Sequence, residues 1–173
     1  MPKPILNIAD VEFSQFGHGV NHPGASDAPE KFSARLGDIG RRLGAQKLGY
    51  NVTVVPPGKR AWPFHNHRIN EEMFLVLDGE GEVRIGAETF PIKKGDVIAN
   101  PPGGPETAHQ IVNTSSADLT YLAVSTRISP EIVDYPDSGK FGVLAELAGP
   151  EGKPQIWRFV NRGEASLNYW DGE

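Results

Sequence analysis

The 173-residue sequence contains no cysteine. Disulfides, thiolate ligands and thiol nucleophiles are therefore all excluded, and any metal ion has to be bound by nitrogen and oxygen atoms. The sequence also lacks a continuous apolar run near the roughly 20 residues that a membrane-spanning helix needs. Residues 1–7 lack the apolar core of a secretory signal. The sequence thus predicts a cytoplasmic protein with no membrane partner.

An excess of positive charge is missing as well. The chain has 17 lysine and arginine residues against 22 aspartate and glutamate residues, a net charge of −5. This balance disfavours a general nucleic-acid binder, and small molecules are the expected partners. The length is near the usual size of one domain, so residues 1–173 are predicted to form a single domain.

Short apolar or alternating stretches dominate the middle of the sequence. Turn-forming residues, among them Asp78-Gly79 and Lys94-Gly95-Asp96, separate them. Many short strands at such spacing are typical of an all-β sandwich or barrel. The predicted strands cover residues 50–55, 73–77, 83–85, 88–92, 97–99, 109–112 and 119–124.

Three histidines and a glutamate form the most informative pattern. Successive side chains of an extended strand point to opposite faces, so His65 and His67 share a face while Asn66 points away. Glu72 opens the next apolar run, and His109 lies in a later strand-like run. Imidazole nitrogens and a carboxylate oxygen gathered from separate segments suit a first-row divalent metal ion. An isolated pair of histidines on a strand edge is more often simply solvated, so the surrounding pattern has to decide.

That pattern resembles the two motifs of the cupin superfamily. The first motif reads Gly, about five residues, His-x-His, three or four residues, Glu, six residues, Gly. The second reads Gly, five residues, Pro-x-Gly, two residues, His, three residues, Asn. The corresponding residues here are Gly58, His65, His67, Glu72 and Gly79, then Gly95, Pro101, Gly103, His109 and Asn113.

Two departures from the motifs affect the loops. Six residues rather than five follow Gly58, and five rather than two separate Gly103 from His109. The ligand types are kept, but the loop of residues 104–108 is unusual for the family. The resemblance covers about residues 47–126.

The resemblance implies a double-stranded β-helix, the jelly-roll barrel of the cupins, over about residues 47–126. We expect residues 1–46, which are rich in glycine and proline, to form an irregular arm that wraps the barrel or a neighbouring subunit. A homodimer is the expected assembly, because such an arm can cover an exposed sheet edge. Residues 127–173 are expected to form a tail with a short helix over 143–148, closed by Gly149-Pro150.

His65, His67, Glu72 and His109 are, by this resemblance, the ligands of one divalent transition metal ion. Manganese, iron, nickel, cobalt and zinc all accept this donor set. Four protein ligands leave one or two positions open on a five- or six-coordinate ion, as a catalytic or sensing site requires. The predicted function is action on a small oxygen-rich metabolite, as a sugar- or sugar-phosphate-type isomerase. A metal-dependent dioxygenase and a non-catalytic ligand-binding or sensing cupin are the alternatives.

The base that an isomerase needs is less well defined by the sequence. Glu71 and Glu106 are the carboxylates that the two motif segments offer as catalytic residues, and Glu71 can instead orient an imidazole or replace Glu72 as ligand. The tyrosines at positions 50 and 121 are alternatives within strands. Three cations near the first motif are candidates for holding an anionic substrate, namely Lys59, Arg60 and Arg68.

Overall fold

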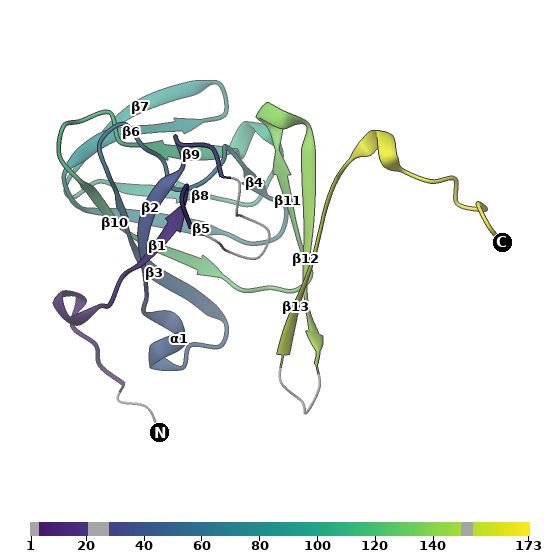
Figure 1. Ribbon diagram of the computed structural model, residues 1–173, viewed down its shortest axis with the longest axis horizontal. Helices are drawn as coiled ribbons and strands as arrows, with labels where there is room; N and C mark the ends of the chain where they lie inside the picture. Colours follow the sequence, from purple (N-terminus) through teal and green to yellow (C-terminus); the bar gives the residue numbers. More distant parts are fainter. Residues whose placement is uncertain (1–3, 21–27, 150–153) are drawn as a thin grey trace.

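The computed structural model describes residues 4–20, 28–149 and 154–173, which form three antiparallel sheets (Figure 1). The largest sheet has the order β1 (Ser14–Gly17), β2 (Ser33–Asp38), β3 (Leu48–Val55), β10 (Leu119–Thr126), β5 (Glu72–Asp78), β8 (Val97–Asn100). The second has the order β7 (Glu88–Lys93), β6 (Glu80–Ile85), β9 (His109–Val112). The third has the order β13 (Pro154–Arg162), β12 (Lys140–Ala148), β11 (Glu131–Tyr135), β4 (Asn66–His67).

Each strand predicted between residues 50 and 124 is confirmed, from β3 to β10. The turns also lie where the sequence places them. Gly79 joins β5 to β6 with φ of 82°, and a Cβ added there would lie 2.4 Å from the carbonyl oxygen of Asp118. Glycine is therefore required at this turn, both for its backbone conformation and for the close approach of a neighbouring chain segment.

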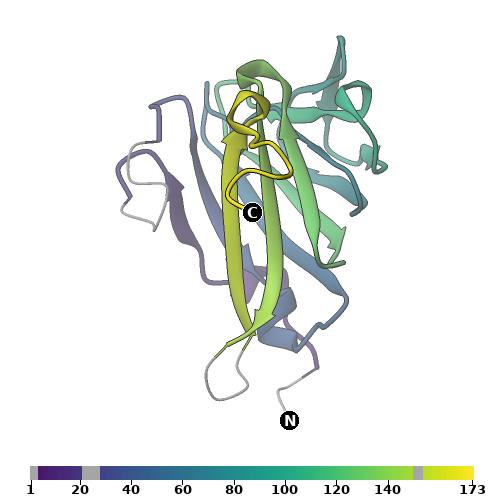
Figure 2. The ribbon, with the colours of Figure 1, turned by 90° about the vertical axis from the view of Figure 1, so that its right-hand side faces the viewer.

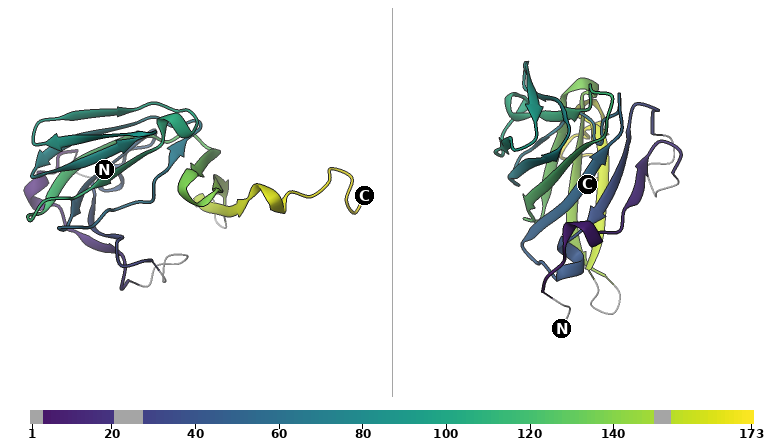
Figure 3. Two further views of the ribbon diagram at one scale, coloured as in Figure 1. Left: turned by 90° about the horizontal axis from the view of Figure 1, so that it is seen from above. Right: turned by 90° about the vertical axis from the view of Figure 1, so that its left-hand side faces the viewer.

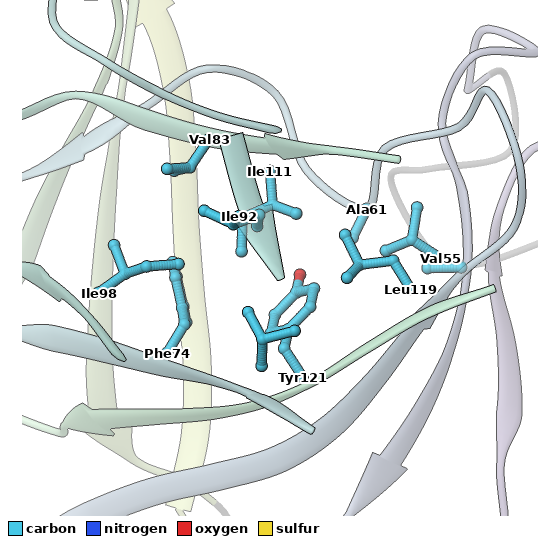
Figure 4. Packing of buried hydrophobic residues seen from close by; sticks show 11 residues of the cluster. Val55, Ala61, Phe74, Val83, Ile92, Ile98, Ile111, Leu119 and Tyr121 are labelled. Carbon is cyan, nitrogen blue, oxygen red and sulfur yellow. The ribbon is translucent and has the colours of Figure 1, made fainter. Parts of the chain in front are cut away.

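The main core fills the space between the six-stranded and the three-stranded sheets (Figure 4). Phe74 and Tyr121 point from the larger sheet toward Val83 and Ile111 of the smaller one, and Val76 belongs to the same cluster. These side chains are at most 5% exposed. Two sheets that bury their facing side chains in this way form the barrel expected from the alternating strands.

The amino-terminal region is more regular than predicted. Two of its segments, β1 and β2, extend the large sheet, and β2 pairs with β3 from Arg35↔Val54 to Asp38↔Asn51. Val11 and Ile39 pack with Val52 and Val54 in a second apolar cluster on the outer face of that sheet. The expectation of an irregular arm is thus wrong for these strands, because β2 pairs with β3 and β1 with β2, and this pairing satisfies backbone groups. Residues 21–27 lie outside the described residues.

The helix predicted over residues 143–148 is also wrong, since this segment is the second half of strand β12. It pairs on one side with β11, through Val143↔Ile132, and on the other with β13, through Val143↔Phe159. Pairing with β13 runs through residue 148, whereas pairing with β11 ends at Leu144. These ladder hydrogen bonds outweigh the modest helix propensity of alanine, leucine and glutamate. Pro150 lies outside the described residues.

The sheet of β11, β12 and β13 stands beside the barrel and joins it through β4 (Figures 1 and 2). Seen from above, the chain after β13 extends away from the barrel (Figure 3). Strand β13 exposes Ile156, Trp157, Phe159 and Val160, each at least 42% accessible. The homodimer expected from the sequence stays a prediction, and these exposed apolar side chains are compatible with it.

Among the described residues there is no helix whose length and apolar character would let it cross a membrane.

Replacing a fully buried core leucine should measurably destabilise the barrel. Leu119 is 0% exposed and packs in the main core. We expect Leu119→Ala to lower the free energy of unfolding by about 2–5 kcal/mol, because it removes buried methyl groups and leaves a cavity. Urea denaturation measures this change. The matched control is Leu167→Ala, whose side chain is 77% exposed; equal losses in the two variants would contradict the assigned core.

Candidate metal centre

The four residues of the sequence pattern meet where strands of all three sheets end or begin. Glu72 and His109 are the first residues of β5 and β9, and His67 lies on the short strand β4. His65 forms an isolated bridge with His109, in which each backbone N–H donates to the other residue's carbonyl, at 3.2 and 2.7 Å. Backbone pairing therefore brings together ligands from two distant motifs.

One ligand atom from each of His65, His67, Glu72 and His109 lies within 4.8 Å of the others. The Glu72 Oε2 atom is 3.1 Å from His109 Nε2 and 3.5 Å from His67 Nε2. Asn66 points away from this group, as the strand alternation predicts, and its Nδ2 donates to the carbonyl of Gly103. The group can hold a metal ion, and its donor atoms are the nitrogen and oxygen types that a cysteine-free chain can offer.

The Nδ1 atoms of His65 and His109, on the opposite side of each ring from Nε2, lie close to backbone carbonyl acceptors. His65 Nδ1 lies 2.8 Å from the Pro63 carbonyl, and His109 Nδ1 lies 3.3 Å from the Thr107 carbonyl. His67 Nδ1 lies 3.5 Å from Glu131 Oε2, which is within ion-pair distance but forms no hydrogen bond. Acceptors at Nδ1 favour the tautomer that carries its proton there, which leaves the lone pair on Nε2. Lone pairs of nitrogen and carboxylate then face one another, and a shared cation or proton is needed between them.

The burial of the His67 ring nitrogens also supports a metal ion at this group of residues. Both ring nitrogens of His67 are buried and have no hydrogen-bond partner within the described parts of the chain. Buried polar atoms in native proteins are ordinarily satisfied. A cation coordinated by Nε2 would supply the missing partner on one side of the ring.

Glu131 on β11 is the carboxylate that sequence reasoning missed. It is 7% exposed and accepts the backbone N–H groups of Ile69 and Asn70, as well as the Asn70 side-chain amide. These hydrogen bonds fix its position beside His67 Nδ1. No sequence signal marks it, because it lies in the tail, outside the recognised motifs.

The protonation states of the histidines and the glutamate in this group depend on one another. Burial lowers the pKa of His65 to about 4, assisted by the neighbouring His109. Burial also opposes charge on His67, but Glu72 and Glu131 outweigh it and raise the pKa of that imidazole. For the Glu72 carboxyl, burial is likewise outweighed, and contacts with His109 and His67 hold its pKa well below the usual value. Glu72 is therefore an anion at neutral pH, as a metal ligand must be.

A cavity of about 430 Å³, the metal-side cavity, opens beside the cluster and is lined by three of its members, His65, His67 and Glu72. Its far wall comes from the sheet of β11, β12 and β13 and includes Tyr135, Leu144 and Arg158. The Tyr135 ring stacks on the His65 ring with centroids 6.3 Å apart. Within the described residues Arg158 has no acidic partner, whereas Arg127 at the same cavity pairs with Glu146 at 3.4 Å.

The predicted catalytic carboxylates lie outside this cavity. The backbone N–H of Glu71 donates to Thr126 Oγ1, and the residue is exposed. Glu106 is exposed too, and its carboxylate accepts the backbone N–H of Gly104 at 2.8 Å. That contact stabilises the 3-10 turn Pro105–Thr107, into which the extra loop residues fold before His109. Neither residue contacts the histidines.

The other candidates are also placed elsewhere. Tyr121 is 2% exposed in the main core, where burial raises its pKa, and Tyr50 packs in the second apolar cluster. Lys59 pairs with Glu30 at 2.9 Å, and Arg68 pairs with Asp134 at 2.6 Å. Arg60 lines a different cavity. The cations of the metal-side cavity instead come from the tail.

Comparison with known proteins places the barrel in a family. Residues 51–125 match the model of the cupin domain. The chain carries a cupin domain. A solved cupin-superfamily structure from Silicibacter pomeroyi, named a sugar phosphate isomerase, superposes with a TM-score of 0.74 at 24% identity, covering 97% of this chain and 98% of that one. This similarity to the solved structure shows a shared fold.

Two curated relatives match the cupin domain in sequence. An uncharacterised protein of Methanocaldococcus jannaschii is 36% identical over 72 residues, 42% of this chain and 54% of that protein. An oxalate-binding protein of Thermotoga maritima is 37% identical over 70 residues, 40% of this chain and 54% of that protein. The chain thus spans about half the length of the curated relatives it matches.

His65 and His67, which both line the metal-side cavity, should titrate at well-separated pH values in the metal-free protein. We expect the His67 pKa above 6.5 and the His65 pKa near 4. Glu131→Gln should lower the pKa of His67, because it removes a neighbouring negative charge. Imidazole resonances followed by NMR between pH 3.5 and 9 test both pKa values.

The same shifts have opposite effects on stability. Since the folded-state pKa of His65 is lowered, the protein should lose stability from this residue as the pH falls from 6.5 through 4. Since the pKa of His67 is raised, its contribution is full below the unfolded value of 6.5 and is lost as the pH rises through the folded value. A His67 pKa at or below 6.5 would show that the two carboxylates do not act on it as described.

Proposed function

We propose that the protein is a metal-dependent enzyme that isomerises a small anionic, oxygen-rich metabolite of the sugar-phosphate type. One observation carries the proposal: three imidazoles and a carboxylate converge beside a cavity. The far wall of this cavity presents the phenol of Tyr135 and Arg158, a cation without an acidic partner among the described residues. A ligand-binding cavity of this kind, with a few convergent polar groups, is the usual form of a small-molecule site.

His65, His67, Glu72 and His109 are the proposed metal ligands. The lone pairs directed toward one another, the unsatisfied nitrogens of His67 and the ionised Glu72 all fit a divalent cation. Such an ion would act as a Lewis acid toward the carbonyl and hydroxyl oxygens of the substrate. Glu131 would hold His67 with Nε2 directed to the ion. The nitrogen and oxygen donors suit manganese, iron, nickel, cobalt and zinc alike.

Arg158 is the proposed holder of the substrate's anionic group. It lies on β13 in the cavity wall and is exposed. A guanidinium binds phosphate or carboxylate oxygens through two parallel hydrogen bonds, which fixes the orientation of the ligand. The anionic end of a substrate would then lie at the wall of the third sheet, and its hydroxyl groups would lie toward the histidines.

Tyr135 is the proposed proton carrier at a substrate oxygen. Burial raises the pKa of its phenol, with Arg158 acting in the opposite direction. The hydroxyl therefore keeps its proton at neutral pH and can donate it as a hydrogen bond. In the isomerisation, water in the cavity would take a proton from the carbon beside the carbonyl and return one to the former carbonyl carbon. Tyr135 would give its proton to the carbonyl oxygen and regain one from the hydroxyl oxygen, so that no atom is gained or lost.

Binding without catalysis is the second candidate, and a specific observation favours it. Besides the ligand Glu72, the cavity is lined by two carboxylates, of which Glu131 is occupied by backbone and amide donors and Glu146 pairs with Arg127. Neither is free to remove a proton from carbon. One curated relative is named an oxalate-binding protein. Chelation of a small dicarboxylate by a bound ion would require no such base.

Metal content is the first property to measure. Protein purified without an affinity metal should contain close to one transition metal ion per chain, and a His65→Ala, His109→Ala double variant should lose it, because two of four ligands are removed. His18→Ala, which replaces a surface histidine, is the matched control and should keep the metal. Elemental analysis gives the count. Iron lost in the double variant would redirect the work to oxygen-consuming reactions, and equal content in wild type and double variant, with none added back, would overturn the metal site.

Turnover of a sugar phosphate separates the two candidates. We expect the metal-loaded protein to interconvert aldose and ketose phosphates and to incorporate solvent deuterium at carbon, as followed by proton NMR. Arg158→Gln should raise KM roughly 10-fold or more, since a charge-assisted pair contributes more than about 1.4 kcal/mol. Tyr135→Phe should lower kcat by about 10²-fold or more with metal content unchanged.

The control for both variants is Lys93→Gln, an exposed lysine on β7 away from the metal-side cavity. Absence of exchange with any aldose or ketose phosphate, together with metal-dependent binding of oxalate in titration calorimetry, would support the binding protein instead.

A further inference from the structure

A second cavity lies next to the metal-side cavity and takes no part in the proposed reaction. Its volume is about 700 Å³, and we refer to it as the outer cavity. Phe16, Pro63 and Tyr135 line both cavities and form the wall between them. None of the four proposed metal ligands lines the outer cavity.

Three cations from segments far apart in the sequence line the outer cavity: Lys31, Arg60 and Lys140. The backbone brings the first two together, because the N–H of Arg60 donates to the carbonyl of Lys31 at 3.0 Å. Lys140 begins β12 and is paired in register with Tyr135. In residues 4–20, 28–149 and 154–173, none of these cations forms an ion pair.

The acidic group at the same cavity is already neutralised. Asp137 accepts two hydrogen bonds from Arg84, at 3.0 and 2.9 Å. The Arg84 guanidinium in turn lies 3.6 Å over the ring of Phe64, which also lines the cavity. The positive charge of the three cations is therefore unbalanced locally, although the whole chain carries a net charge of −5.

Arg60 supplies an independent indication of a missing partner. Its Nη1 donates to Gln110 Oε1 at 3.3 Å, and Gln110 is held by donating to the Trp62 carbonyl at 2.6 Å. The Arg60 Nε atom is buried and has no acceptor among the described residues. A buried donor without an acceptor is unfavourable, and it is more so on a charged group. An anion beside this guanidinium would satisfy both the hydrogen-bonding and the charge requirement.

The remaining lining suggests what the anion is attached to. The rings of Phe16, Phe32, Phe64 and Tyr135 face the same cavity. Aromatic walls bind planar apolar groups through dispersion and edge-to-face contacts. The outer cavity thus combines a cationic set with an aromatic surface.

We propose that the outer cavity binds a small organic anion, a phosphate or carboxylate borne on a planar apolar body. Arg60 and Lys140 hold the anionic group, and the aromatic side chains contact the body. This site is separate from the proposed metal centre and does not depend on the reaction assigned to it.

Titration calorimetry with phenyl phosphate tests the proposal, with inorganic phosphate as the second probe. We expect one phenyl phosphate to bind per chain, and Arg60→Gln and Lys140→Gln each to weaken binding at least 10-fold. Lys93→Gln removes a distant surface charge and should bind like wild type. Because Lys140 is exposed at the start of a strand, its variant should fold even if the Arg60 variant does not.

The His65→Ala, His109→Ala double variant separates this site from the metal centre. Binding of phenyl phosphate should persist in that variant. Loss of binding there would place the ligand at the metal centre and overturn the proposal, as would wild-type affinity in both cation variants or no binding at all. If inorganic phosphate bound as tightly as phenyl phosphate, the aromatic body would be the part of the proposal that fails.

Discussion

The site depends on one close contact between largely buried groups. The Glu72 carboxylate lies 3.1 Å from His109 Nε2 and 3.5 Å from His67 Nε2. Burial alone would neutralise all these groups, yet the contacts keep Glu72 ionised and His67 readily protonated. The cluster is stable only if something positive lies between its members. A proton can serve in the metal-free protein, and a divalent ion satisfies more of the donors at once.

The barrel holds these groups in place through backbone pairing. The reciprocal hydrogen bonds between His65 and His109 join the two motif segments, and the pairing of His67 with Val133 ties the same motif to the third sheet. Rigid strand ends are suitable positions for ligands because their backbone is fixed by neighbours on both sides. The third sheet then contributes what the barrel lacks: Glu131 behind the histidine, and Tyr135 and Arg158 across the cavity.

Charge is divided between two adjacent cavities in a chain that is acidic overall. Arg127 and Arg158 serve the metal-side cavity, whereas Lys31, Arg60 and Lys140 line the outer one. Arg68 and Lys59 are taken up by Asp134 and Glu30 and are not available to either. Concave sites with one sign of charge concentrate ligands of the opposite sign. The outer cavity, in which three cations face one carboxylate, is therefore suited to an anion. The metal-side cavity also holds Glu72, Glu131 and Glu146, so an anion there would depend on the bound ion and on Arg158.

Local patterns in the sequence determined the barrel strands from β3 to β10 and the Gly79 turn, because alternation and turn composition are properties of neighbouring residues. The grouping of His65, His67, Glu72 and His109 followed from the resemblance of the two motifs to those of the cupins. Tertiary structure alone decided the rest. Residues 143–148 have the composition of a helix, but pairing with β13, and with β11 up to Leu144, makes them part of β12. Glu131 and Arg158 line the metal-side cavity, whereas Glu71 and Glu106 do not. The surroundings of a side chain depend on which distant segments pack against it, and sequence spacing does not determine that packing.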